Sequence, residues 1–217
     1  MSDTNTGLYV HYGAGRIAPK EWINFDASPT LRVQKIPLIG KWLAKKGQGF
    51  NFPEALLFGD IVKGLPLPNE SCKAIYCAHV IEHLSREDAL KALGNTWKLL
   101  AKGGVFRCTL PNMRVYAARY LERVESGDRD ACHKLVREAG LGVEDSHDGW
   151  RGPLRRTFGN YMHLWMWDES SFEDALRQAG FTSIRPCSKG DASDPMFQLV
   201  EYESRFRDAL AYECFKE

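Results

Sequence analysis

The sequence lacks the features that mark membrane-spanning, secreted or disulfide-stapled proteins. It contains no run of about 18 apolar residues, so it predicts no transmembrane helix. The polar first residues, Met1 to Thr6, do not fit a secretory signal. Six cysteines are present, but they are scattered and form no C-x-x-C pair, which indicates reduced, mostly buried thiols. We therefore expect a cytoplasmic protein.

An excess of charge of one sign is also missing. Lys and Arg number 29 against 28 Asp and Glu, a net charge of +1, so the overall balance does not favour a nucleic-acid partner. Residues 31–46 are the local exception, with five basic side chains, no acid and an amphipathic pattern. This stretch predicts a helix that packs on the rest of the protein, with peripheral membrane contact as the alternative.

Short apolar runs alternate with helical patterns along most of the chain. This order is typical of an α/β protein with a Rossmann-like, mostly parallel sheet and helices on both faces. We expect residues 1–217 to form a single domain, interrupted at about 113–167 by a helical and glycine-rich insertion that acts as a lid. The expected strands are 8–12, 22–25, 55–58, 74–81, 105–110, 183–187 and 210–215.

Two helices have clear end signals. The first begins at Ser85, a natural N-cap followed by acidic residues, and is expected to end at Gly103–Gly104. The second covers about 171–179, and Ser170 and Glu173 are expected to form its capping box. Each helix precedes an expected strand, which is the order that a parallel α/β sheet requires.

A glycine loop follows the first expected strand. In Tyr12-Gly13-Ala14-Gly15, the glycines allow a sharp bend and a close approach of backbone amides to a ligand. Asp26 and Asp60 stand at the ends of the second and third expected strands, and parallel strands bring such ends to one edge of a sheet. Asp26 is therefore placed to accept hydrogen bonds from ribose hydroxyls, and Asp60 from an adenine amino group.

Residues 13–18 also match the G-x-G-x-x-A dinucleotide fingerprint, so the loop alone leaves a nicotinamide-dependent reductase open. A dinucleotide fold places its acid about 20 residues after the fingerprint, beyond a full helix. Here Asp26 follows Gly13 by only 13 residues, and Pro19 interrupts the interval. The short interval favours a ligand that carries a ribose but no phosphates.

These motifs together resemble the class I S-adenosylmethionine-dependent methyltransferases, in particular the large bacterial, type 11-like group with a short first helix. The resemblance covers most of the chain outside 113–160. It rests on Tyr12-Gly-Ala-Gly15, Trp22-Ile-Asn-Phe-Asp26, Gly59-Asp60-Ile61 with Leu65-Pro-Leu-Pro68, His79-Val-Ile-Glu-His-Leu84, Leu100-Ala-Lys-Gly-Gly104 and His163-Leu-Trp-Met-Trp-Asp168.

The resemblance implies a seven-stranded sheet whose last strand runs antiparallel. It also implies S-adenosylmethionine as cofactor and S-adenosylhomocysteine as product. In this interpretation the backbone of residues 12–15 contacts the methionine part of the cofactor, and Asp26 binds the ribose. Asp60 and Ile61 lie at the adenine, and Ala78 and His79 lie beside the methionine part.

The segment His79-Val-Ile-Glu82-His83 fits the H-x-x-E-H zinc-peptidase motif, but it is expected on a strand-to-helix turn and not on the helix that the motif requires. Some related O-methyltransferases hold a divalent ion near the acceptor at this place. His79, Glu82 and His83 are therefore candidate metal ligands, with His163 as a further one; the alternative is that Glu82 and His83 hydrogen-bond locally and orient the turn. His83 and His163 are also the candidate catalytic bases.

The sequence thus predicts an enzyme that methylates oxygen or nitrogen of a small-molecule or glycan acceptor. A relative that binds the cofactor without turnover is an alternative, because the third glycine of the usual loop is absent. The nicotinamide-dependent reductase is the less favoured one, because of the short interval before Asp26.

Overall fold

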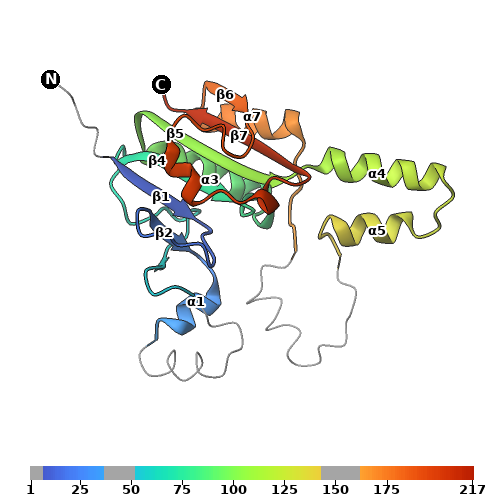
Figure 1. The fold of residues 1–217 in the computed structure, drawn as a ribbon, viewed down its shortest axis with the longest axis horizontal. Coiled ribbons are helices and arrows are strands. Elements are labelled where there is room, and N and C mark those ends of the chain that lie inside the picture. The colour runs from blue at the N-terminus through green and yellow to red at the C-terminus, as the bar shows by residue number, and fades with distance from the viewer. Residues whose placement is uncertain (1–6, 37–51, 143–161) are drawn as a thin grey trace.

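The computed structural model describes residues 7–36, 52–142 and 162–217. Most of the basic stretch 31–46 and the second part of the expected insertion lie outside these ranges. Figure 1 shows a twisted sheet from which a pair of helices projects to one side. In the described parts of the chain, no helix is long and apolar enough to cross a membrane. All six cysteines are free thiols and four of them are buried, as expected from the sequence.

Seven strands form one sheet in the order β3-β2-β1-β4-β5-β7-β6. Strands β1 to β5 pair in parallel, whereas β7 runs antiparallel to both of its neighbours. This topology confirms the Rossmann-like sheet with an antiparallel last strand. The strands are β1 (Leu8–Tyr12), β2 (Ile23–Asp26), β3 (Leu57–Phe58), β4 (Cys72–Ala78), β5 (Leu100–Pro111), β6 (Ser183–Pro186) and β7 (Ala209–Phe215).

Helices α3 (Arg86–Leu99) and α7 (Glu169–Ala179) contact each other and pack on one face of the sheet. The buried face of α3 includes Ala89, Leu93 and Thr96, which recur at helical spacing. The opposite face of the sheet is packed by the short 3-10 helix η2 (Pro195–Leu199). Its Phe197 lies edge-on against Trp22 and Tyr76, so aromatic rings form the core on this side.

The junction of α3 and β5 differs from the sequence expectation. Helix α3 ends at Leu99 and β5 begins at the next residue, so Gly103–Gly104 lies inside the strand and does not end the helix. Leu100 pairs with Cys72 of β4, and the register of the two strands shifts beyond this pair. Gly103 has a φ of 75°, which suits a glycine at such a bulge.

The start of α7 also differs from expectation. The capping box is formed by Asp168 and Ser171, so the expected Ser170–Glu173 pair is wrong. The Oδ1 of Asp168 accepts from the backbone N of Ser171 at 2.9 Å, and the Oγ of Ser171 accepts from the backbone N of Asp168 at 3.1 Å. The extended backbone of Asp168 makes it the N-cap, because its side chain can reach back over the first turn.

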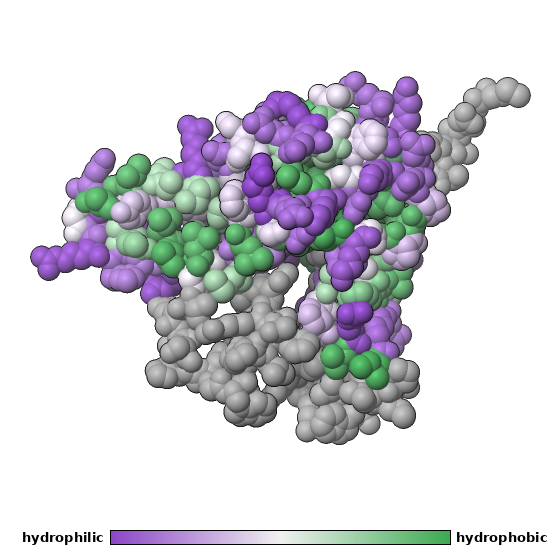
Figure 2. All heavy atoms as spheres, turned by 180° about the vertical axis from the view of Figure 1, so that it is seen from behind, coloured by the Kyte–Doolittle hydropathy of each residue, from purple (hydrophilic) through white to green (hydrophobic). Residues whose placement is uncertain are grey.

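The chain between β5 and α7 leaves the sheet as a hairpin of α4 (Met113–Glu125) and α5 (Ala131–Glu138), which projects at the right of Figure 1. At its far end, this segment returns to the residue from which it left β5. Asn112 and Trp167 form an isolated bridge, and the backbone N of Met113 donates to the backbone oxygen of Trp167 at 2.8 Å. Apolar side chains are exposed along this hairpin, among them Leu121 and Val124 (Figure 2).

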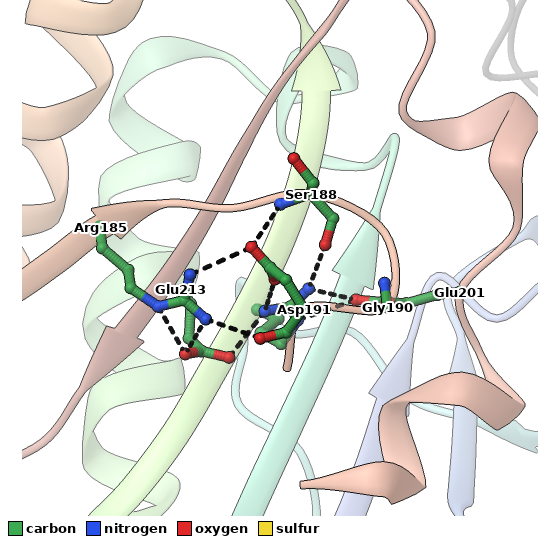
Figure 3. A network of polar contacts seen from close by, with 7 residues as sticks. Arg185, Ser188, Gly190, Asp191, Glu201 and Glu213 are labelled. Atoms are coloured by element: carbon green, nitrogen blue, oxygen red, sulfur yellow. Dashed lines mark hydrogen bonds and ion pairs between the residues drawn. The ribbon is translucent and has the colours of Figure 1, made fainter. Parts of the chain in front are cut away.

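A charged network lies on the η2 face of the sheet, between β5 and β7 (Figure 3). Arg107 is 1% exposed and holds Glu213 and Glu201 at 2.7 Å each. The backbone N of Gly190 donates to the second oxygen of Glu201 at 2.9 Å. The network is completed by Arg185, Ser188 and Asp191. These contacts join β7 and the segment 185–201 that precedes it to the central strand β5.

Candidate functional site

A cleft of about 390 Å³ lies at the carboxyl ends of β1, β2, β3 and β4. This edge is where open α/β sheets bind their ligands, because several loops converge there. The lining residues come from the connections that follow these four strands. They are Tyr12, Gly13, Asp26, Ala27, Ser28, Pro29, Gly59, Asp60, Ile61, Val62, His79, Val80, His83 and Leu84.

The turn after β1 presents backbone, and not a side chain, to the cleft. Gly13 and Gly15 have φ angles of 69° and 56°, in the left-handed region that favours glycine. A Cβ on Gly13 would overlap with the side chain of Val80, whereas the same position on Gly15 faces open space. The side chain of Tyr12 is buried, with its hydroxyl 3.2 Å from the Oγ1 of Thr96 on α3. A side chain at position 13 would therefore collide with Val80, whereas one at position 15 would not.

The carboxylate of Asp26 holds the loops on either side of it. Its Oδ2 accepts from the backbone N of Gly15 at 3.0 Å, and its Oδ1 accepts from the backbone N of Ser28 at 2.7 Å. Each carboxylate oxygen can accept a second hydrogen bond. Asp26 can therefore accept hydrogen bonds from a ligand in the cleft while it fixes the glycine loop.

Asp60 lies on the next loop and is also partly engaged. Its Oδ1 accepts from the backbone N of Val62 at 3.0 Å, and its Oδ2 lies 3.4 Å from the exposed ammonium of Lys63. The side chain of Asn95 on α3 donates to the backbone oxygens of Ile61 and Val62, at 2.9 and 3.1 Å. The loop that carries Asp60 is thus anchored to α3, with the backbone of Ile61 fixed beside the cleft.

The interval between β1 and β2 is described throughout and contains no helix. Backbone hydrogen bonds shape it into turns, from the N of Ala14 to the oxygen of Phe25 at 3.1 Å and from the N of Ile17 to the oxygen of Ala14 at 2.9 Å. A dinucleotide site binds its diphosphate at the N-terminus of a helix in this place. The observed turns therefore favour a ligand without phosphates.

His79 begins the turn after β4 in an unusual conformation. Its φ is 54°, which is uncommon for a residue with a side chain, and such strain gathers at functional sites. Its backbone N donates to the oxygen of Thr109 at 2.9 Å. The ring lies between two acceptors, with Nδ1 at 3.1 Å from the Oε1 of Glu82 and Nε2 at 3.0 Å from the backbone oxygen of Arg205. These contacts hold the ring at the edge of the cleft.

His83 follows on the 3-10 helix η1 (Ile81–His83) and meets His163, which comes from the far end of the insertion. The two ring centroids are 5.0 Å apart. The Nδ1 of His83 lies 3.0 Å from the backbone oxygen of Met162, and the Nδ1 of His163 lies 2.7 Å from that of Ala139. Burial lowers the pKa of His163 from 6.5, although the charge of Glu82 opposes this shift.

The structure brings most of the residues expected at the cofactor to the cleft. Tyr12, Gly13, Asp26, Asp60, Ile61 and His79 line it, as does the candidate base His83. Ala14, Gly15 and Ala78 do not line the cleft, and His163 stands behind His83. The sequence missed Ala27, Ser28, Pro29, Gly59, Val62, Val80 and Leu84. Most of these adjoin a residue that was expected there, so the flanks of each motif were the available signal.

Comparison with known proteins agrees with this geometry. A family model described as "Methyltransferase domain" matches residues 14–185. The match includes both acids at the cleft and the turn that begins at His79. The protein belongs to the class I S-adenosylmethionine-dependent methyltransferases.

Solved structures that are similar to this methyltransferase have low sequence identity to it and TM-scores below 0.5. One comes from a complex of a methyltransferase and its activator from Haloferax volcanii: it is 14% identical, with a TM-score of 0.48 and coverage of 97% of this chain and 82% of that one. A methyltransferase from Thermotoga maritima is 14% identical, with a TM-score of 0.49 and coverage of 97% and 83%. One from Archaeoglobus fulgidus is 13% identical, with a TM-score of 0.47 and coverage of 98% and 87%. No curated protein matches the sequence.

Proposed function

We propose that this methyltransferase transfers the methyl group of S-adenosylmethionine to an oxygen or nitrogen of a small-molecule or glycan acceptor. The observation that carries the proposal is the cleft in which the glycine loop, Asp26 and Asp60 meet at the carboxyl ends of neighbouring strands. The loop supplies backbone that can approach the methionine part closely. Asp26 accepts from the ribose hydroxyls, and Asp60 with Ile61 holds the adenine.

This arrangement leaves the other end of the cleft for the reacting methyl group. Ala78 ends β4, and His79 and His83 follow it at the cleft. Methyl transfer needs the acceptor in line with the sulfonium methyl, so positioning supplies most of the rate. We propose that the acceptor lies against His83 and His163, where a neutral imidazole can receive its proton. Of the segment 113–167 that the sequence predicts as a lid, the described residue His163 meets His83 at this end.

Isothermal titration calorimetry with S-adenosylmethionine, S-adenosylhomocysteine and NAD on one sample tests the cofactor. We expect both adenosyl compounds to bind and NAD not to bind, because no helix follows the glycine loop between β1 and β2, where a dinucleotide site binds its diphosphate. Binding of NAD together with no binding of the adenosyl compounds would overturn the proposal.

Turnover is measured separately, as release of S-adenosylhomocysteine in the presence of sugar, phenol and amine acceptors. A methyltransferase releases it with at least one acceptor class. Cofactor binding with no release across all three classes is the result expected of a relative that binds the cofactor without turnover, and it would contradict methyl transfer to these acceptors.

A further inference from the structure

Three groups able to bind a metal ion converge next to the cleft, and one of them, His83, also lines it. Glu82, His83 and His163 each offer one ligand atom, and these atoms all lie within 4.8 Å of one another. Glu82 and His83 belong to η1, whereas His163 is 80 residues further along the chain. The carbonyl oxygen of Glu82 accepts from the backbone N of Leu164 at 2.7 Å, so the returning chain is fixed on the turn. The cluster is therefore a product of the fold and not of one flexible loop.

Both imidazoles are oriented by backbone carbonyls. The Nδ1 of His83 faces the oxygen of Met162, and the Nδ1 of His163 faces the oxygen of Ala139. A carbonyl only accepts, so each Nδ1 carries the proton and the lone pair of each ring is on Nε2. Metal-binding histidines are oriented in this way, with one ring N–H donated to a carbonyl or carboxylate. The two rings thus already have the tautomer that an ion requires.

Glu82 completes the set with a carboxylate that is buried and half satisfied. Its side chain is 1% exposed, and its Oε1 is held by the ring of His79. Its Oε2 is buried and has no hydrogen-bond partner among the described residues. A buried carboxylate oxygen without a donor is costly, so such a group calls for a cation. Glu82 belongs to the same cluster as two imidazoles, each of which has a lone pair on one ring nitrogen.

We propose that Glu82, His83 and His163 form a binding site for a divalent transition-metal ion of the zinc type. Two imidazoles and one carboxylate suit Zn²⁺, Co²⁺, Mn²⁺ or Fe²⁺, whereas Mg²⁺ and Ca²⁺ prefer oxygen ligands. Ligands about 2.1 Å from one ion lie at most about 4.2 Å apart, so atoms that already lie within 4.8 Å of one another need at most small side-chain rotations to complete the site. Because the described residues supply three ligands and a tetrahedral ion takes four, one position on the ion is left for a further ligand.

The open position gives the ion a role at the cleft, and this role rests on the proposed methyl transfer. His83 lines the cleft as well as belonging to the cluster, so the ion stands at the border of the two. An acceptor oxygen bound to the ion would be held next to the reacting methyl group. The ion would lower the pKa of a bound hydroxyl, so its proton would leave to water before the oxygen takes the methyl group from the sulfonium, in place of direct proton transfer to an imidazole. An acceptor with a free hydroxyl or other oxygen donor suits this arrangement better than an amine.

The test uses Co²⁺ and Zn²⁺ as probes on the full chain after dialysis against a chelator. Visible absorption follows Co²⁺ binding, and competition follows Zn²⁺. We expect one ion per chain, bound in the micromolar range or tighter. The replacements Glu82→Gln, His83→Gln and His163→Gln should each weaken binding by on the order of 100-fold. The matched control is His133→Gln, because His133 is an exposed histidine of α5 and should leave binding unchanged.

Thermal melting and S-adenosylhomocysteine calorimetry on the same variants separate the outcomes. Unchanged melting together with lost Co²⁺ binding supports the site. Failure of the unaltered protein to bind either ion, or equal binding by His163→Gln and His133→Gln, overturns the site and leaves the cofactor proposal intact if S-adenosylhomocysteine still binds. Ion binding without any binding of the adenosyl compounds would instead overturn the proposed function alone.

Discussion

Arg107 of β5 and Glu213 of β7 are direct cross-strand partners whose charged groups meet at 2.7 Å, with side chains only 1% and 2% exposed. The pair therefore lies in the interior, where each charge depends on the other. Arg107 also holds Glu201 at 2.7 Å, so one guanidinium serves two buried carboxylates. Removal of the guanidinium leaves Glu201 without a charged partner among the described residues, whereas Glu213 keeps Arg185 at 2.7 Å.

We expect Arg107→Met to lower the free energy of unfolding by about 3–5 kcal/mol, because breaking a buried ion pair leaves an uncompensated charge in the interior. Urea denaturation measures this change. The control is Arg177→Met on α7, where the ion pair with Glu173 is exposed at the arginine and should matter little. Equal effects of the two replacements would show that Arg107 does not stabilise the core through its charge.

Asp26→Asn should weaken S-adenosylhomocysteine binding by on the order of 10- to 100-fold, since a charged acceptor of ribose hydroxyls becomes a neutral one. Asn keeps one carbonyl oxygen, so part of the hold on Gly15 and Ser28 remains. Calorimetry measures the affinity, and thermal melting monitors the fold. Asp168→Asn is the control, because Asp168 is a capping aspartate outside the cleft. Similar losses in both variants would contradict a ribose contact at Asp26.

Gly13→Ala should impair cofactor binding more than Gly15→Ala does. Both replacements cost about 1–2 kcal/mol of backbone strain at a positive φ, but only the Cβ on Gly13 also overlaps with Val80. Calorimetry with S-adenosylhomocysteine gives the comparison. A second replacement, Val80→Ala, should restore part of the affinity of Gly13→Ala because it removes the overlapping methyl group. No restoration, with equal losses for the two glycine variants, would rule out the steric explanation.

The stability of the protein should depend on pH through His11, a buried residue of β1. Burial lowers the pKa of His11 from 6.5 to about 4. Between these values the unfolded chain binds the proton and the folded chain does not, so stability falls as the pH falls from 6.5 towards 4. The loss attributable to this residue is up to about 3 kcal/mol.

Urea denaturation of the unaltered protein and of His11→Gln at several pH values isolates this contribution. All other titratable groups are present in both proteins. The difference between the two curves of unfolding free energy against pH therefore reports His11 alone. We expect the variant to lose less stability than the parent over the interval. Parallel curves would mean that His11 is not held neutral in the interior.

The sequence predicted the sheet well because its signals are local. Each apolar run that ends in a glycine or an aspartate became a strand with a cleft loop after it, as at Tyr12, Asp26 and Phe58. The predicted end of α3 was wrong, because the pairing of β5 with β4, and not a local sequence signal, decides where the helix ends. Leu100 could continue the helix by its own preference, but its pairing with Cys72 of β4 places it in the strand.

The site was predictable only in part, for a related reason. The sequence indicated the residues of the glycine loop, the two acids and the histidines. It could not indicate that Met162 and Ala139 supply the carbonyls that orient the two rings, since these contacts join segments 79 and 24 residues apart. Likewise, no local pattern connects Arg107 with Glu201, which lies 94 residues away.

The bridge between Asn112 and Trp167 brings the two ends of the segment between them together beside β5. Because the two ends are fastened to each other, we expect changes of length within this segment to leave the pairing of β5 with β7 unchanged. If Asp26 and Asp60 bind the cofactor as proposed, the contacts of this segment with the acceptor could change during evolution while the cofactor-binding residues stay the same. The same junction offers a natural pair of cut points for building chimaeras with other methyltransferases.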